Sequence, residues 1–94
     1  MKTDMEKLEI ACEVLKALSN PHRLYIVMGL IQNECNVKRM VEKLGMPQST
    51  VSSHIAKLKN AGIIKGKRKG NEICYTISDN TVRALIEQIK RDLG

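Results

Sequence analysis

The sequence predicts one mainly α-helical domain over residues 1–94, with five helices and a small β-hairpin. Apolar residues recur at helical spacing through most of the chain. Between residues 63 and 78 the spacing changes to every second residue, on either side of a Lys69-Gly70-Asn71 turn, as in a hairpin. The chain has no Phe or Trp, so aliphatic side chains must fill the core, as they do between packed helices.

Two helices are expected in the first third of the chain. The first covers Asp4 to Leu18, and one of its faces carries an apolar stripe formed by Leu8, Ala11, Cys12, Leu15 and Leu18. Asn20 then caps a second helix, because it is followed by Pro21 at the first helical position. This second helix runs to about Ile31.

Two further helices are separated by a tight turn. Asn36 caps a short third helix that ends at Leu44, and Gly45 provides the turn. The fourth helix runs from Pro47 to about Asn60. Its apolar positions keep helical spacing and are Val51, Ile55 and Leu58.

The hairpin and a last helix complete the chain. The strands are expected over residues 63–68 and 72–78. Asp79 caps the last helix, whose apolar face is formed by Val82, Leu85, Ile86, Ile89 and Leu93. A chain of 94 residues cannot easily cover the apolar faces of both terminal helices. We therefore expect a homodimer formed through the first and last helices.

The net charge of +6 is local rather than general. Six Lys or Arg residues and no acid lie between Lys57 and Lys69, and the other ten basic residues match the ten acidic ones. Such a patch points to a polyanionic partner at one place on the surface.

Composition also bears on location and on the class of protein. No segment has the roughly 20 apolar residues of a membrane span, and the N-terminus is unlike a signal peptide, so we expect a cytoplasmic protein. The three cysteines are an odd number at wide spacing, which does not suggest a secreted disulfide framework. The sequence shows no Cys-His pair, paired-carboxylate motif or phosphate-binding glycine loop, so no enzymatic activity is expected.

A helix, a tight turn, a second helix and a basic hairpin together form a winged helix-turn-helix. Three segments, ALSNPHRLYIV at 17–27, PQSTVSSHIAKLKNAGII at 47–64 and ICYTISD at 73–79, resemble the ArsR/SmtB family of dimeric bacterial and archaeal repressors. The resemblance covers nearly the whole chain. It implies a homodimeric repressor that binds an inverted-repeat operator in double-stranded DNA.

The fourth helix and the hairpin supply the candidate DNA-binding residues. Short hydrogen-bonding side chains suited to base edges in the major groove are Gln48, Ser49, Ser52 and Ser53. The cations better placed for phosphates are Lys57, Lys59, Lys67, Arg68 and Lys69. His54 is either a groove contact, a metal ligand or a locally packed side chain, and this motif favours local packing.

The metal and persulfide sites that the family resemblance would imply are not retained. Asn36 and Lys38 stand where the two thiolates of one metal site are expected. At the other metal site Asp79 remains, but Thr81 and Asp92 replace two histidines. Met28 occupies the first position of the persulfide-sensing cysteine pair. We therefore expect no metal site and no cofactor, and the inducer, operator sequence and regulated genes stay open.

The cysteines remain as candidate redox residues. Cys12 is expected to be a small buried side chain near the dimer face, and Cys74 to point outward from the hairpin. Cys35 lies near Lys38 and Arg39 at a helix start, which favours a reactive thiolate and makes it the preferred switch. The alternative function is a constitutive architectural nucleic-acid-binding protein or a protein-interaction module on the same scaffold.

Overall fold

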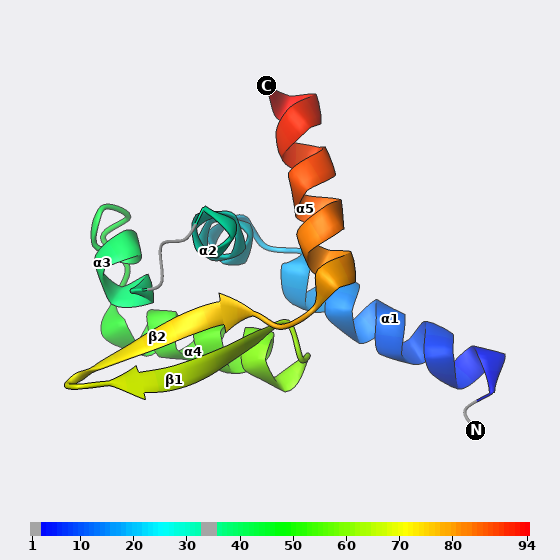
Figure 1. Cartoon of the computed structure of the whole chain (residues 1–94), viewed down its shortest axis with the longest axis horizontal. Coiled ribbons are helices and arrows are strands. Elements are labelled where there is room, and N and C mark those ends of the chain that lie inside the picture. The colour runs from blue at the N-terminus through cyan, green and yellow to red at the C-terminus, as the bar shows by residue number, and fades with distance from the viewer. Residues whose placement is uncertain (1–2, 33–35) are drawn as a thin grey trace.

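A computed structural model describes residues 3–32 and 36–94 (Figure 1). Over these residues the chain forms five helices and one antiparallel two-stranded sheet, which confirms the predicted winged helix-turn-helix. In order, the elements are α1 (Asp4–Leu18), α2 (Pro21–Ile31), α3 (Val37–Glu42), α4 (Gln48–Asn60), β1 (Ile64–Lys69), β2 (Glu72–Ile77) and α5 (Asn80–Leu93).

Side chains just before the helices explain where most of them begin. The Asn20 carboxamide oxygen accepts hydrogen bonds from the backbone N–H groups of His22 and Arg23, at 2.9 and 3.1 Å. Asp79 caps α5 in the same way, at 2.9 and 3.1 Å. Both side chains satisfy N–H groups that have no partner within the helix, so the predicted caps are confirmed.

The third helix is shorter than the sequence predicts, because α3 ends at Glu42 rather than at Leu44. The Leu44 N–H donates to the Val41 carbonyl at 2.9 Å, and the Gly45 N–H donates to the Glu42 carbonyl at 3.2 Å. Each of these bonds joins two residues that are three positions apart, whereas the bonds of an α-helix join residues four apart. The last turn is therefore tighter than an α-helical turn. The α-helix therefore ends two residues before the predicted end, and the chain turns toward α4 from there.

The hairpin strands each lie within one residue of the expected bounds. Lys69 pairs with Glu72, which leaves Gly70 and Asn71 as a two-residue turn, and Gly70 has a φ of 62° that favours glycine there. At the base, Ser78 donates from its backbone N–H to the Ile63 carbonyl at 2.8 Å. The hairpin is thus closed at both ends and stands on the body of the protein as a wing.

The core lies where α2, α4, the start of β1 and the first half of α5 meet. Ile26, Leu58 and Ile63 are fully buried in it, and Ile86 of α5 joins them. The methionines behave as predicted: Met40 is part of the core, and Met28 and Met46 pack against it. Because α2 and α4 share this core, the exposed face of α4 has a fixed orientation relative to the rest of the chain.

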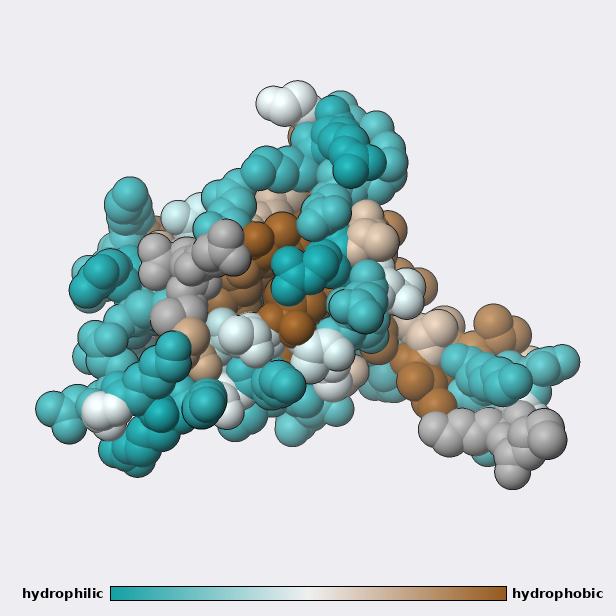
Figure 2. All heavy atoms as spheres, viewed as in Figure 1, coloured by the Kyte–Doolittle hydropathy of each residue, from teal (hydrophilic) through white to brown (hydrophobic). Residues whose placement is uncertain are grey.

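The terminal helices leave large apolar side chains in contact with solvent. Most of α1 projects from the body, and only its last turn is buried (Figure 1). Leu8 is 59% exposed and Leu15 is 54% exposed, and Leu85 and Leu93 of α5 are also exposed. Figure 2 shows hydrophobic residues along the projecting part of α1 and in the region between α1 and α5. These faces have no partner within the described part of the single chain.

Cys12, which is expected to be buried near a dimer face, is exposed within the single chain. The reason is that the apolar stripe of α1 to which Cys12 belongs has no other element packed on it at that position within the described residues.

Across the two described stretches, no helix has the length and hydropathy of a membrane-spanning segment.

Candidate nucleic-acid interface

One face of α4 is covered with short polar side chains. Gln48, Ser49, Ser52 and Ser53 are all exposed, whereas Val51, His54 and Leu58 on the opposite side are buried. The spacing of 3.6 residues per turn places the four polar residues on adjoining positions of the solvent face. The structure therefore gathers the four residues that the sequence indicates for base contacts.

His54 does not belong to that exposed face. It is only 8% exposed, and its Nδ1 lies 3.2 Å from Nη1 of Arg23, which is equally buried. Its ring also meets the His22 ring edge to face, with 5.8 Å between the centroids. The structure thus agrees with the interpretation that His54 packs locally.

The surroundings of His54 favour its neutral form. Burial lowers the pKa of His54 below its ordinary value of 6.5, and the positive charges of Arg23, His22 and Lys57 lower it further. Because a guanidinium only donates hydrogen bonds, Nδ1 must accept and Nε2 must carry the proton. The buried side of α4 is therefore fixed by a neutral histidine and a charged arginine.

The wing carries three lysines in a row on one of its faces. Alternate residues of a strand point to the same side, so Lys65, Lys67 and Lys69 share a face, on which Lys67 is paired with Cys74. Arg68 points to the other face, where its strand partner is Ile73. The three wing cations that the sequence groups together are thus divided between two faces.

The two lysines of α4 also lie on opposite edges of its exposed face. Lys59 lies near the edge formed by Gln48 and Ser52. Lys57 lies on the other edge, where it lines a pocket together with Lys16 of α1 and Arg23 of α2. Of the two α4 lysines, Lys59 is therefore the one on the side of Gln48 and Ser52, two of the candidate base-contact residues.

The beginning of α4 faces the tip of the wing. Gln48 lines a hollow of about 430 Å³ together with Lys38 at the start of α3 and Asn71 in the wing turn. In Figure 1, α3, the first turns of α4 and the wing tip lie together at one end of the molecule. The candidate base-contact residue Gln48 thus lines the same hollow as a cation and the hairpin turn.

Three residues of this surface are additional to those indicated by the sequence. Lys65 completes the lysine row, and strand alternation alone is enough to find it. Ala56 lies on the exposed face of α4 beside Ser52 and Ser53, with a methyl group suited to contact with thymine. Lys38 lines the same hollow as Gln48, which lies in another helix, and no local sequence pattern reveals this.

Of the candidate redox residues, the structure describes Cys12 and Cys74, and these two lie on different elements. Cys74 is half-buried on the lysine face of the wing, and Cys12 is exposed on α1. Cys35, the preferred switch, lies outside the described residues. The structure thus shows no pair of thiols in contact among the described residues.

Comparison with known proteins identifies the family. The profile of the bacterial regulatory proteins of the arsR family matches residues 20–65. The chain is 37% identical over 81 residues to the transcriptional repressor SmtB of Mycobacterium tuberculosis. The aligned region covers 86% of this chain and 60% of SmtB. It therefore spans less than two thirds of that relative.

Solved structures agree with the family assignment. The reduced form of HlyU from Vibrio cholerae, a transcriptional activator, superposes with a TM-score of 0.83 at 35% identity, over 94% of each chain. The homodimeric winged helix-turn-helix domain of Mb0332 from Mycobacterium bovis superposes with a TM-score of 0.81 at 29% identity, over 98% of this chain and 87% of that one. The chain belongs to the ArsR/SmtB family of winged helix-turn-helix transcriptional regulators.

Proposed function

We propose that this chain is a homodimeric, sequence-specific DNA-binding repressor of the cytoplasm, with residues 1–94 acting as one DNA-binding domain. The observation that carries the proposal is the exposed face of α4. Its four short polar side chains lie on the surface, while the same helix is anchored by Leu58 and His54 on its buried side. Such a helix can enter a major groove and present donors and acceptors to base edges.

The charges around this face suit the DNA backbone. The wing presents Lys65, Lys67 and Lys69 on one face, and Lys59 flanks the polar residues of α4. Lysines of this kind neutralise phosphates and release counterions, which gives affinity without sequence preference. We assign base recognition to Gln48, Ser49, Ser52 and Ser53, and phosphate contact to Lys57, Lys59, Lys67, Arg68 and Lys69.

The dimer rests on the apolar stripe of α1. Met5, Leu8, Cys12 and Leu15 alternate by three and four residues, which is the spacing of a helix that packs along another helix. All four are exposed in the single chain. A second copy of the chain, packed through α1 and α5, would cover this stripe and present two copies of α4 to successive turns of the major groove.

Thiol chemistry is the regulatory part of the proposal. Cys12 lies within the α1 stripe, so a change in its oxidation state would alter the surface on which the dimer depends. Cys35 remains the preferred switch from the sequence. We propose that oxidation weakens DNA binding by shifting the spacing between the two copies of α4.

Selection from a random duplex library tests the function. The purified protein is expected to enrich an inverted repeat whose half-site centres lie about one helical turn, or a multiple of it, apart. Enrichment of unrelated sequences without a common motif would reject the proposal and favour an architectural DNA-binding protein.

Binding to the selected duplex then tests regulation. The reduced protein is measured alone, after mild oxidant and after zinc, beside Cys12→Ser, Cys35→Ser and Cys74→Ser. We expect oxidant to weaken binding by the parent protein and to have little effect on Cys35→Ser, and we expect zinc to have no effect. A parent protein that is indifferent to oxidant would reject the thiol proposal and leave the DNA-binding proposal intact.

A further inference from the structure

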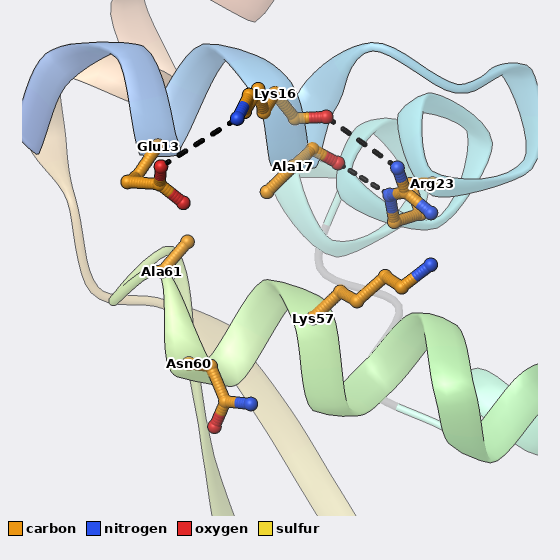
Figure 3. Close-up of a pocket in the computed structure, with 7 residues that line it drawn as sticks. All are labelled: Glu13, Lys16, Ala17, Arg23, Lys57, Asn60 and Ala61. Atoms are coloured by element: carbon orange, nitrogen blue, oxygen red, sulfur yellow. Dashed lines mark hydrogen bonds and ion pairs between the residues drawn. The ribbon is translucent and has the colours of Figure 1, made fainter. Parts of the chain in front are cut away.

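A pocket of about 400 Å³ lies behind the base-contact face, between the last turns of α1, the start of α2 and the end of α4 (Figure 3). Its lining includes three cations, Lys16, Arg23 and Lys57, and a single carboxylate, that of Glu13. The pocket is therefore positively charged. Neither the base contacts nor the proposed dimer surface accounts for it.

The arginine in this pocket is buried without a counter-charge. Arg23 is 8% exposed, and its hydrogen-bond partners are uncharged: the carbonyls of Lys16 and Ala17 and the neutral His54 ring. Within the described residues, the single ion pair joins Lys16 to Glu13 at 3.9 Å and does not include Arg23. Buried charges in proteins are normally paired, so this guanidinium leaves an unbalanced positive charge at the pocket wall.

Two N–H groups of the Arg23 guanidinium have no hydrogen-bond partner among the described residues. Of its five N–H groups, Nε–H points to the Ala17 carbonyl, and one N–H on each terminal nitrogen points to His54 or to the Lys16 carbonyl. The described residues supply no acceptor for the remaining N–H of each terminal nitrogen. An oxyanion in the pocket would provide acceptors for both.

The neighbouring cations can complete such a site. Figure 3 shows the Lys57 side chain extending from α4 toward Arg23, on the side that faces α1. Lys16 bonds to Glu13 through an exposed pair, which is weak enough to be exchanged for a stronger partner. Asn60 points away from Arg23 in the same view and is not needed.

We propose that this pocket binds a phosphoryl oxyanion, held by Arg23, Lys16 and Lys57. Charge-assisted hydrogen bonds from a guanidinium and two ammonium groups are the usual means of phosphate recognition. The site joins α1, which carries the proposed dimer stripe, to α4, which carries the proposed base contacts. An oxyanion bound there stabilises one arrangement of α4 relative to α1.

Titration with inorganic phosphate and pyrophosphate, followed by nitrogen-15 NMR of the full chain without DNA, tests the site. We expect saturable shifts at Arg23 Nε–H and at the backbone amides of Ala17 and Ala61. The double variant Lys16→Gln/Lys57→Gln should weaken binding by about tenfold, the effect of losing roughly one charge-assisted hydrogen bond.

The matched control is Lys7→Gln/Lys90→Gln. It removes the same charge at exposed positions outside the pocket lining and outside the proposed DNA-binding residues. We expect it to change phosphate affinity by less than about twofold, because distant surface charges are screened. Shifts that do not saturate, or equal weakening by the two double variants, would overturn the proposal.

The phosphoryl group has two possible sources, a free phosphate compound and the DNA backbone. Titration of the phosphate-saturated protein with the selected duplex separates them. Displacement of phosphate from Arg23 identifies the backbone as the natural occupant, and retention of phosphate in the DNA complex identifies a free ligand. Because the phosphate titration needs no DNA, its failure is distinguishable from failure of the proposed DNA binding.

Discussion

Nη1 of Arg23 on α2 donates to Nδ1 of His54 on α4 across 3.2 Å. The same guanidinium donates to the Lys16 and Ala17 carbonyls in the last turn of α1. Carbonyls at the end of a helix have no partner within it and carry partial negative charge, so a cation there is favourable. One side chain thus links α1, α2 and α4.

Replacing Arg23 should therefore destabilise the whole domain. We expect Arg23→Leu to lower the free energy of unfolding by roughly 2–3 kcal/mol, because it leaves the Ala17 carbonyl on α1 and Nδ1 of His54 without a donor. Urea unfolding at a fixed protein concentration measures the change. Arg39→Leu, which removes an exposed arginine from α3, is the control, and an equal loss in both variants would contradict this role.

Stability should also decrease in mild acid because of His54. Its pKa is lowered below 6.5 in the folded state by burial and by Arg23, so on acidification the unfolded chain takes up the proton first. This contribution to stability is complete above pH 6.5 and is lost as the pH falls below that value. The His54→Gln variant keeps an acceptor for Arg23, because its amide oxygen can accept the hydrogen bond. Its thermal unfolding temperature should depend less on pH in this range. The same pH dependence in the variant and the parent would show that His54 is not the cause.

The lysine row of the wing should determine part of the salt dependence of DNA binding. For Lys65→Gln/Lys67→Gln, the slope of log affinity against log salt should become shallower by roughly 1 for each lysine that contacts a phosphate. Fluorescence anisotropy at several salt concentrations measures the slope. Lys7→Gln/Lys90→Gln removes the same charge elsewhere and should leave the slope nearly unchanged.

A charge in the α1 stripe should prevent dimer formation. Leu8 is 59% exposed in the single chain, so Leu8→Glu introduces no clash within it, but it would place a carboxylate in the proposed dimer surface. We expect a monomer by analytical ultracentrifugation and a large loss of affinity for the inverted repeat. Lys7→Glu, one residue away and off the stripe, should remain dimeric. A dimeric Leu8→Glu protein would show that the chains associate elsewhere.

The sequence predicts most of the fold because its signals are local. Asn20 before Pro21 and Asp79 before α5 each specify a boundary that the structure confirms. The hairpin turn is also found where it is expected, but Lys69 pairs with Glu72 at the end of β1 and is not part of the turn. In the structure α3 ends two residues before the position that the sequence predicts. There the chain adopts a tighter final turn, and apolar spacing alone does not distinguish that turn from a continuing helix.

The site is less predictable, since it depends on which residues meet across elements. Helical spacing correctly indicates that Gln48, Ser49, Ser52 and Ser53 share an exposed face. It does not reveal that Lys57 faces Arg23 and Lys16 while Lys59 lies on the opposite edge, because that depends on how α1 crosses α4. The partnership of Arg23 with His54 joins residues 31 positions apart and has no local signature.

Base recognition by α4 is best measured as a specificity ratio, the affinity for the selected duplex divided by the affinity for a random duplex. Affinities for the selected duplex and for a random duplex of equal length are measured at the same salt concentration, for the parent protein and for Gln48→Ala/Ser52→Ala. We expect a ratio of about 10³ or more for the parent, falling by roughly tenfold or more in the variant while its unfolding midpoint is unchanged. A parent ratio near 1, or an unchanged ratio in the variant, would contradict base recognition by α4.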